Sequence, residues 1–419
     1  MPTQTPPSRP RSAWAWALYD TGNSAFATVV MAGFFPIFFK TFWSAGADVT
    51  LSTARLGLAN SLAGLLMALC APLLGAAADC GRAKKKYLAV FAAAGIAATA
   101  ALFLVERGCW PLAAALFVAG SIGFSGGNIF YDALLPGVAG PAELDRLSAR
   151  GFALGYLGGG LLFAGCIWLT LNPGMCGGAA PAAVRISFVL TAIWWAVFTV
   201  PLLLWVPEPG RCSPASRPLR SALAELRRTL HTIRRIKPAW MFLLAYWCYI
   251  DGVDTIIRMA VDYGLALGLA ANDLILALLI TQFVGFPCAL LFGQLGRRWG
   301  AKKALYLAIG GYLGIVLWGM VMTNKTEFYL LAAMVGLVQG GIQALSRSYF
   351  ARLIPPGREA QFFGFYNMVG KYAVIFGPAL MGLTGYFFQS SRAGIASIAL
   401  FFILGAFLLS RVQEKSQAP

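Results

Sequence analysis

A pattern of acidic and basic residues interrupts an apolar stretch in the second half of the chain. Asp251, Asp254 and Arg258 stand in YIDGVDTIIRMA, residues 249–260. Spacings of three, four and seven place the three side chains on one side of a helix. An ionised aspartate in mid-bilayer costs at least ~2.5–3.5 kcal/mol, so it persists only beside protein, water or a partner.

Two interpretations of this stripe stay open. In the first, Asp254 and Arg258 form an internal ion pair that only neutralises charge and fixes packing. In the second, the stripe lines a central cavity, where Asp251 binds a cation or exchanges a proton and Arg258 holds a carboxylate. Removal from water favours the neutral form of a carboxyl group, which suits proton exchange.

The first apolar segment carries a counterpart in YDTGNSAF, where Asp20 and Asn23 share a helical face. Asp20 is either a cavity residue or an acid favoured by the positive end of its helix dipole. Near the carboxyl end, Lys371 follows Tyr366 and Asn367 in another apolar segment. Lys371 lies too deep to reach water easily, so it pairs with an aspartate of another helix or contacts a solute.

The elements that hold these residues are membrane-spanning helices. The chain has 419 residues, 59% hydrophobic and 12% charged, with a mean hydropathy of +0.71. Runs of roughly 20 apolar residues cross the ~30 Å hydrocarbon layer as helices, and open strand edges cannot be satisfied there. The sequence therefore predicts an all-α integral membrane protein with helices at 13–40, 53–78, 86–105, 111–133, 151–171, 183–206, 239–261, 273–295, 303–323, 327–350, 362–388 and 393–411.

The charge distribution predicts how these helices are oriented. The net charge is +17, but the basic residues gather in alternate connections rather than on one soluble face, which argues against nucleic-acid binding. By the positive-inside rule both termini are cytoplasmic. The start MPTQTPPSRPRS lacks the features of a secretory signal, so the first helix is retained.

Cysteine and histidine usage gives no sign of a metal site or cofactor. The chain has one histidine and no paired CxxC motif, which argues against structural zinc. Two of the eight cysteines, Cys109 and Cys176, fall in outward connections. They either pair as a disulfide in an oxidising compartment or remain two unpaired thiols, and we expect the second.

The helices divide into two halves. A polar, arginine-rich segment at 207–238 separates an N-terminal bundle of six helices, 1–206, from a C-terminal bundle, 239–419. Within this segment Leu219, Leu223, Leu226, Leu230 and Ile233 recur at helical spacing. That helix lies either on the inner membrane surface or docked on the bundle. The motifs YDTGNSAF and YIDGVDTI, GAAADCGRAKKK and GQLGRRWGAKK, and YDALLP and YFARLIPP echo each other, which indicates a parallel internal repeat.

One charged pair is expected to join the two halves. Asp132 and Arg347 lie near the inner ends of the fourth and tenth predicted helices, which are equivalent in the repeat. We expect these side chains to meet when the cytoplasmic side of the protein is closed.

With these motifs in view, the sequence resembles the major facilitator superfamily of secondary transporters. Its loop signature, approximately GxxxDRxGRRK, fits Gly75, Asp79, Arg82, Lys84 and Lys85, with Cys80 in place of the usual arginine. The second copy keeps Gly293, Arg298, Gly300 and Lys302, but Arg297 replaces the usual acid. The resemblance implies two pseudo-symmetric six-helix bundles and a gating role for Asp79 and Arg82.

A narrower resemblance concerns WALYDTGNSAFAT, GFALGYLGGG, YIDGVDTIIRMA, GGIQALSRSYFARLIPP and FFGFYNMVGKYAVIFGP. These segments resemble the subfamily of autophagy-related vacuolar amino-acid effluxers and their bacterial relatives. The resemblance implies export of a solute, with amino acids as the best-known substrate class. Thr21 and Gly22 depart from the common Trp-Ala of the first motif and leave Asp20 and Asn23 in place.

Together these features predict an alternating-access carrier rather than an enzyme. Buried acids and the lack of an ATP-binding motif favour a proton or another ion as the coupling ion. We expect a monomer in the bacterial inner membrane that contacts lipids and exports amino acids or similar zwitterions. The alternatives are a non-transporting receptor or lipid scramblase of the same fold, or a membrane-embedded transferase, which would need clustered aspartates at the membrane surface for Mg²⁺.

Overall fold

The computed structural model describes residues 10–47, 49–81, 83–176, 180–208, 230–266, 269–388 and 391–413. Every regular element in these ranges is a helix. The expected gating residue Arg82 and most of the predicted linker helix, including Leu219, Leu223 and Leu226, lie outside the described residues.

Six long helices make up the first half of the chain. The first begins as α1 (Pro10–Ala25) and continues through a π-helical segment (Phe26–Phe34), α2 (Phe35–Phe38) and a second π-helical segment (Phe39–Trp43) as one rod. The others are α3 (Val49–Gly81), α4 (Lys84–Ala101), α5 (Trp110–Val138), α6 (Leu144–Leu171) and α7 (Ala180–Trp205).

Six more long helices make up the second half: α9 (Lys237–Ala266), α10 (Ala271–Trp299), α11 (Ala301–Val321), α12 (Lys325–Leu353), α13 (Glu359–Phe388) and α14 (Ser391–Ser410). Within the described residues, eleven helices are long and apolar enough to cross a membrane, and α13 is a further helix of 30 residues. Each of the twelve predicted spans falls on one of these helices.

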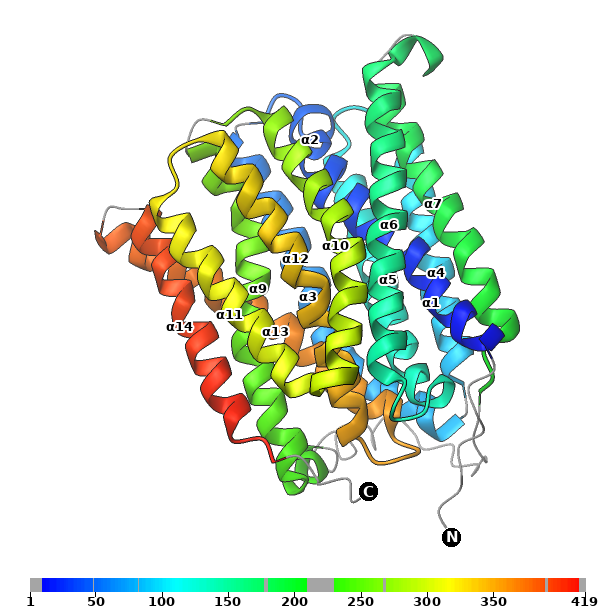
Figure 1. The fold of residues 1–419 in the computed structure, drawn as a ribbon. Coiled ribbons are helices and arrows are strands. Elements are labelled where there is room, and N and C mark those ends of the chain that lie inside the picture. The colour runs from blue at the N-terminus through cyan, green and yellow to red at the C-terminus, as the bar shows by residue number, and fades with distance from the viewer. Residues whose placement is uncertain are drawn as a thin grey trace.

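The two halves pack by the same rule. In the first half α1 packs on α6 and α7, α4 packs on α5 and α7, and α3 packs on α5. In the second half α9 packs on α13 and α14, α11 packs on α12 and α14, and α10 packs on α12. This correspondence in chain order gives the pseudo-symmetric bundles that the internal repeat predicted, and the two lie beside each other in Figure 1.

The halves meet chiefly along two helix pairs, α3 with α13 and α6 with α10, and α6 also contacts α12 and α5 contacts α13. Glycines allow the close approach in both pairs. A Cβ at Gly75 would overlap the carbonyl group of Ala360, and a Cβ at Gly293 would overlap the Cβ of Ala149. The two glycines are equivalent in the repeated loop motif, so close packing accounts for their presence in both copies.

The start of α1 and the end of α14 lie at the same end of the bundle (Figure 1). We call this end the terminal face and the other end the opposite face. The basic residues that predicted a cytoplasmic side lie in helix ends and connections at the terminal face, among them Lys84, Lys85, Arg297, Arg298 and Arg358.

Candidate functional site

A cavity of about 510 Å³ lies between the two halves. Its walls come from both bundles, with Asp20, Asn128 and Tyr156 on one side and Asp254, Gln343 and Asn367 among those on the other. The lining runs from Arg347, toward the terminal face, to Met322 and Phe328, next to the connection at the opposite face. The volume lies within the ~300–1,000 Å³ range of small-molecule sites.

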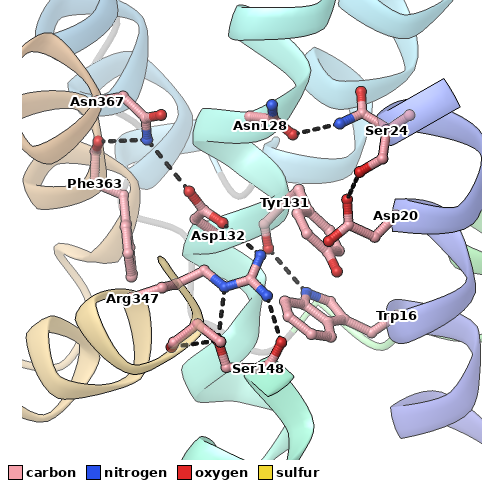
Figure 2. Close-up of polar contacts among 12 residues, drawn as sticks. Trp16, Asp20, Ser24, Asn128, Tyr131, Asp132, Ser148, Arg347, Phe363 and Asn367 are labelled. Atoms are coloured by element: carbon pink, nitrogen blue, oxygen red, sulfur yellow. Dashed lines mark hydrogen bonds and ion pairs between the residues drawn. The ribbon is translucent and has the colours of Figure 1, made fainter. Parts of the chain in front are cut away.

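A buried ion pair closes the cavity toward the terminal face. Arg347 of α12 donates from Nη1 to Oδ1 of Asp132 on α5 at 3.1 Å, and both side chains are almost fully buried. Asn367 of α13 donates to the other oxygen of Asp132 at 3.3 Å. The contact expected between Asp132 and Arg347 across the halves is therefore present (Figure 2).

Further contacts fix the guanidinium group of Arg347 inside the N-terminal bundle. It donates from Nε to the hydroxyl of Ser148 at 2.9 Å and from Nη2 to the carbonyl oxygen of Ser148 at 2.8 Å. Its Cζ lies 4.4–5.1 Å from the ring centroids of Phe152, Trp16 and Tyr131. A cation from one half is thus held by hydrogen bonds, an anion and three aromatic faces of the other half.

Asp20 borders the same cavity from α1. The hydroxyl of Ser24 donates to Oδ1 of Asp20 at 2.6 Å, whereas Oδ2 is buried and has no hydrogen-bond partner among the described residues. Asn23, one turn further, donates to Oδ1 of Asn128 at 2.7 Å, which ties α1 to α5. Asp20 therefore lies at the cavity wall, which agrees with its interpretation as a cavity residue.

Asp251 does not line the cavity, which corrects the expectation from the sequence. Asp254 lines the cavity, but Asp251 lies outside the lining and is fully buried against α13. Its Oδ1 accepts from the backbone N–H of Gly377 at 2.9 Å. The cavity residues of α9 include Tyr246, Ile250 and Asp254, which recur every four residues, so Asp251 falls on the flank of that stripe.

The remaining expected residues divide into two groups. Tyr366 and Asn367 line the cavity, as expected for residues that contact a solute. The side chains of Arg258 and Lys371 lie outside the described residues, so the expected ion pair with Asp254 and the role of Lys371 stay predictions. Cys109 is a free thiol, and the side chain of Cys176 is also outside the described residues.

Asp79 joins the halves through the first turn of α13. Its two carboxylate oxygens accept from the backbone N–H groups of Ala360 at 3.1 Å and Gln361 at 2.7 Å. Lys84 lies between two anions, 3.1 Å from Asp79 and 2.8 Å from Glu359. The carboxylate thus occupies the positive end of a helix dipole, and Lys84 links it to Glu359 of the other half, while the gating role of Arg82 stays a prediction.

A third connection between the halves was missed from the sequence. Asp145 at the start of α6 is buried; it accepts from the hydroxyl of Ser348 at 2.5 Å and pairs with Arg352 at 2.7 Å. Arg352 also donates to the carbonyl oxygen of Pro141. Asp145 lies just before the apolar span predicted to begin at 151, and a carboxylate at such a position is typical of an ordinary loop. The repeat could have indicated its role, because the start of α6 is equivalent to the start of α13.

Polar amides also line the cavity. They are Asn128, Gln282, Gln339 and Gln343. Asn128 also accepts from Asn23. Gln339, Gln343 and Arg347 recur every four residues on α12, a stripe that identifies the cavity face of that helix.

The geometry defines a class of protein. Two pseudo-symmetric six-helix bundles enclose a cavity with charged and polar walls, and ion pairs between the bundles close one end of it. This is the architecture of a major facilitator superfamily transporter, a membrane carrier of small solutes rather than an enzyme.

The comparisons with known proteins agree with this class. The family described as "Vacuole effluxer Atg22 like" matches residues 49–418. An uncharacterised MFS-type transporter of Bacillus subtilis, YxiO, is 37% identical over 96% of this chain and 95% of its own length. Autophagy-related protein 22 of Coccidioides immitis is 26% identical over 79% of this chain and 67% of its own. The chain therefore belongs to the Atg22-like effluxer family.

Solved structures share the fold at low sequence identity. The human organic anion transporter MFSD10 superposes with a TM-score of 0.76 at 17% identity, covering 95% of this chain and 99% of its own. The proton:xylose symporter XylE superposes with a TM-score of 0.75 at 13% identity, covering 96% of each chain.

Proposed function

We propose that this transporter exports an amino acid or a similar zwitterion in exchange for protons. The observation that carries the proposal is the environment of Asp20. One of its carboxylate oxygens is buried at the wall of the central cavity without a hydrogen-bond donor among the described residues.

An unsatisfied, buried carboxylate oxygen is unstable unless something compensates its charge. Leaving such a group unpaired costs several kcal/mol, and a bound proton or another bound cation removes that cost. Because Asp20 faces a cavity that a solute enters, it can exchange this proton or cation with the water in the cavity. Its other oxygen is already held by Ser24, which keeps the carboxyl group in one orientation.

The charges around the cavity support a zwitterionic solute. Asp20 offers negative charge to an ammonium group, and Asn128, Gln339 and Gln343 offer amide donors to a carboxylate. Arg347 also borders the cavity, but its hydrogen bonds to Asp132 and Ser148 hold it in the closure. The description of the family as effluxers supports export rather than import.

The orientation follows from the positive-inside rule. The terminal face carries the basic connections, so we place it in the cytoplasm. The closed contacts of Asp132, Asp79 and Asp145 then seal the cavity from the cytoplasm, and their release would open it inward for loading. The protein works in this scheme as a monomer in the bacterial inner membrane.

Flux measurements in proteoliposomes test the proposal. The wild type should show uptake or release of amino acids that responds to an imposed pH gradient. Asp20→Asn removes the exchangeable proton, so its flux should lose the response to the gradient. Asp251→Asn is the matched control, because Asp251 lies outside the cavity and its amide oxygen still accepts from Gly377; its flux should stay coupled.

Two outcomes would contradict the proposal. If Asp20→Asn retains full coupling while Asp251→Asn loses it, Asp20 is not the coupling group. If the wild type moves no solute under any gradient, a receptor or scramblase of this fold becomes the better explanation.

A further inference from the structure

The central cavity extends into the C-terminal bundle. Part of its lining comes from the opposite-face half of α13 and from α11 and α14, two helices that have no printed contact with the N-terminal bundle. We call this part the side pocket, and its residues are Ile315, Val316, Gly319, Met381, Ile395 and Ile398.

The N-terminal bundle has no matching extension among the described residues. Its helices α4 and α7 occupy the places of α11 and α14 in the repeat, yet neither contributes a residue to the described cavity lining. Aromatic side chains pack between these two helices and the first helix. Phe26 lies 5.4 Å from the ring of Trp195, and Trp195 in turn packs on Gly95 of α4.

The two bundles share one fold, but among the described residues only the C-terminal bundle has this pocket, so the fold does not require it. Protein interiors normally pack without voids, because each void deprives its lining of dispersion contacts. In the first half large aromatic residues meet that demand between the first helix, α4 and α7, whereas the described lining of the side pocket consists of isoleucines, Val316, Met381 and Gly319. A space that the fold could close, but that this sequence leaves open to the cavity, is available to part of a ligand.

The cavity wall therefore has an apolar region and a polar region. The described side chains of the side pocket are all apolar. The carboxylates and amides of the lining are other residues, among them Asp20 and Asn128 on the N-terminal bundle and Asp254, Gln339, Gln343 and Asn367 on the C-terminal bundle. A ligand that satisfies both regions needs a compact polar end and an apolar end.

We propose that the transported solute is an amphiphilic zwitterion, whose amino and carboxylate groups bind the polar wall while an apolar tail longer than a common amino-acid side chain enters the side pocket. This inference rests on the proposed function and makes its substrate class more specific. A free small amino acid would leave the side pocket empty, and the cavity volume of about 510 Å³ suits a larger solute.

A homologous series measures the pocket directly. Straight-chain L-2-amino acids, from 2-aminobutyrate to 2-aminodecanoate, keep one polar end and add methylenes. Binding is measured by calorimetry on the protein in lipid nanodiscs, with protein-free nanodiscs subtracted to remove partitioning into lipid. Each methylene that enters an apolar pocket should raise affinity by roughly fourfold, until the pocket is full.

Two substitutions on α11 locate the effect. Gly319→Leu places a side chain in the side pocket, where a Cβ would lie 3.7 Å from Ile395, so the gain per methylene should end at a shorter chain. Gly310→Leu is the matched control, because Gly310 is exposed and nothing lies within 4 Å of its added Cβ. Its series should match the wild type. Ile398→Ala enlarges the pocket and should move the best chain length upward.

The outcomes separate this inference from the transport mechanism. Affinity that does not rise with chain length, or a rise equal in wild type and Gly319→Leu, overturns the side-pocket assignment. If short zwitterions still move with the pH gradient in that case, the proposed function stands. If affinity rises with chain length but no member is transported, the pocket stands and the proposed function fails.

Discussion

Removing the charge of Asp132 should open the terminal face. Asp132→Asn preserves the size of the side chain but leaves the guanidinium of Arg347 without its anion, in a site where Arg347 is only 3% exposed. The hydrogen bonds from Arg347 to Ser148 and its contacts with three rings remain. The closed conformation then contains a buried cation that has lost its hydrogen-bonded counterion.

The size of the effect follows from the burial of the pair. Removing one partner of a buried ion pair destabilises the state that contains it by about 3–5 kcal/mol. At 1.4 kcal/mol for each factor of ten, this shifts the closed-to-open equilibrium by about two to four orders of magnitude. Arg347→Gln should shift it in the same direction, because it leaves Asp132 with only the amide of Asn367.

The double variant carries the sharper prediction. When both charges are removed, no unpaired charge remains. The double variant, Asp132→Asn with Arg347→Gln, should therefore shift the closed-to-open equilibrium by less than the sum of the two single shifts. Spin labels at Lys86 and Lys303, in a cysteine-free background, would report the distance across the terminal face by pulsed electron resonance. Both positions are exposed, one in each half.

A control pair tests whether the coupling is specific. Asp251→Asn combined with Arg347→Gln should be additive within about 0.5 kcal/mol, because the two residues share no partner in the described structure. Additive behaviour of Asp132→Asn with Arg347→Gln would refute the reasoning, since it would mean that the pair contributes nothing to closure.

Three further predictions concern other contacts of the closed state and Asp251. Asp79→Asn removes an anion from the positive end of α13, so the label distance at the terminal face should lengthen, with a cost of about 1–2 kcal/mol to closure. Gly75→Leu should lower the thermal stability of the closed form through overpacking of about 1–3 kcal/mol, whereas Gly64→Leu on the same helix, where nothing lies within 4 Å of an added Cβ, should not. Asp251→Ala should lower the melting temperature by leaving the buried N–H of Gly377 unpaired, at about 1–3 kcal/mol, whereas Asp251→Asn should melt near the wild type.

The architecture could be predicted from the sequence because the bilayer imposes it. Long apolar runs have one stable solution in lipid, so the twelve segments and their division into halves followed from hydropathy and the repeated motifs alone. The boundaries were less accurate: α6 begins at Leu144 rather than near 151, because its first turns carry charged residues that apolarity does not detect.

The site was predictable only where a residue type admits few explanations. An aspartate or arginine deep in an apolar helix must face a partner or a cavity, which identified Asp20, Asp132 and Arg347. The choice between Asp251 and Asp254 depends on a rotation of less than one residue step about α9, and helical spacing cannot fix that rotation without neighbours. Lys84 and Asp145 were missed because residues near helix ends are equally at home in water.

Accessibility of the cavity from each side tests the central claim most directly. Gln343→Cys in a cysteine-free background places one thiol in the cavity lining, on the cavity side of the Asp132–Arg347 pair. A membrane-impermeant thiol reagent should label it from the opposite face in the closed wild type, and from the terminal face once Asp132→Asn is added. Labelling from the terminal face alone, or from neither side in either variant, would contradict a cavity that these contacts close at one end.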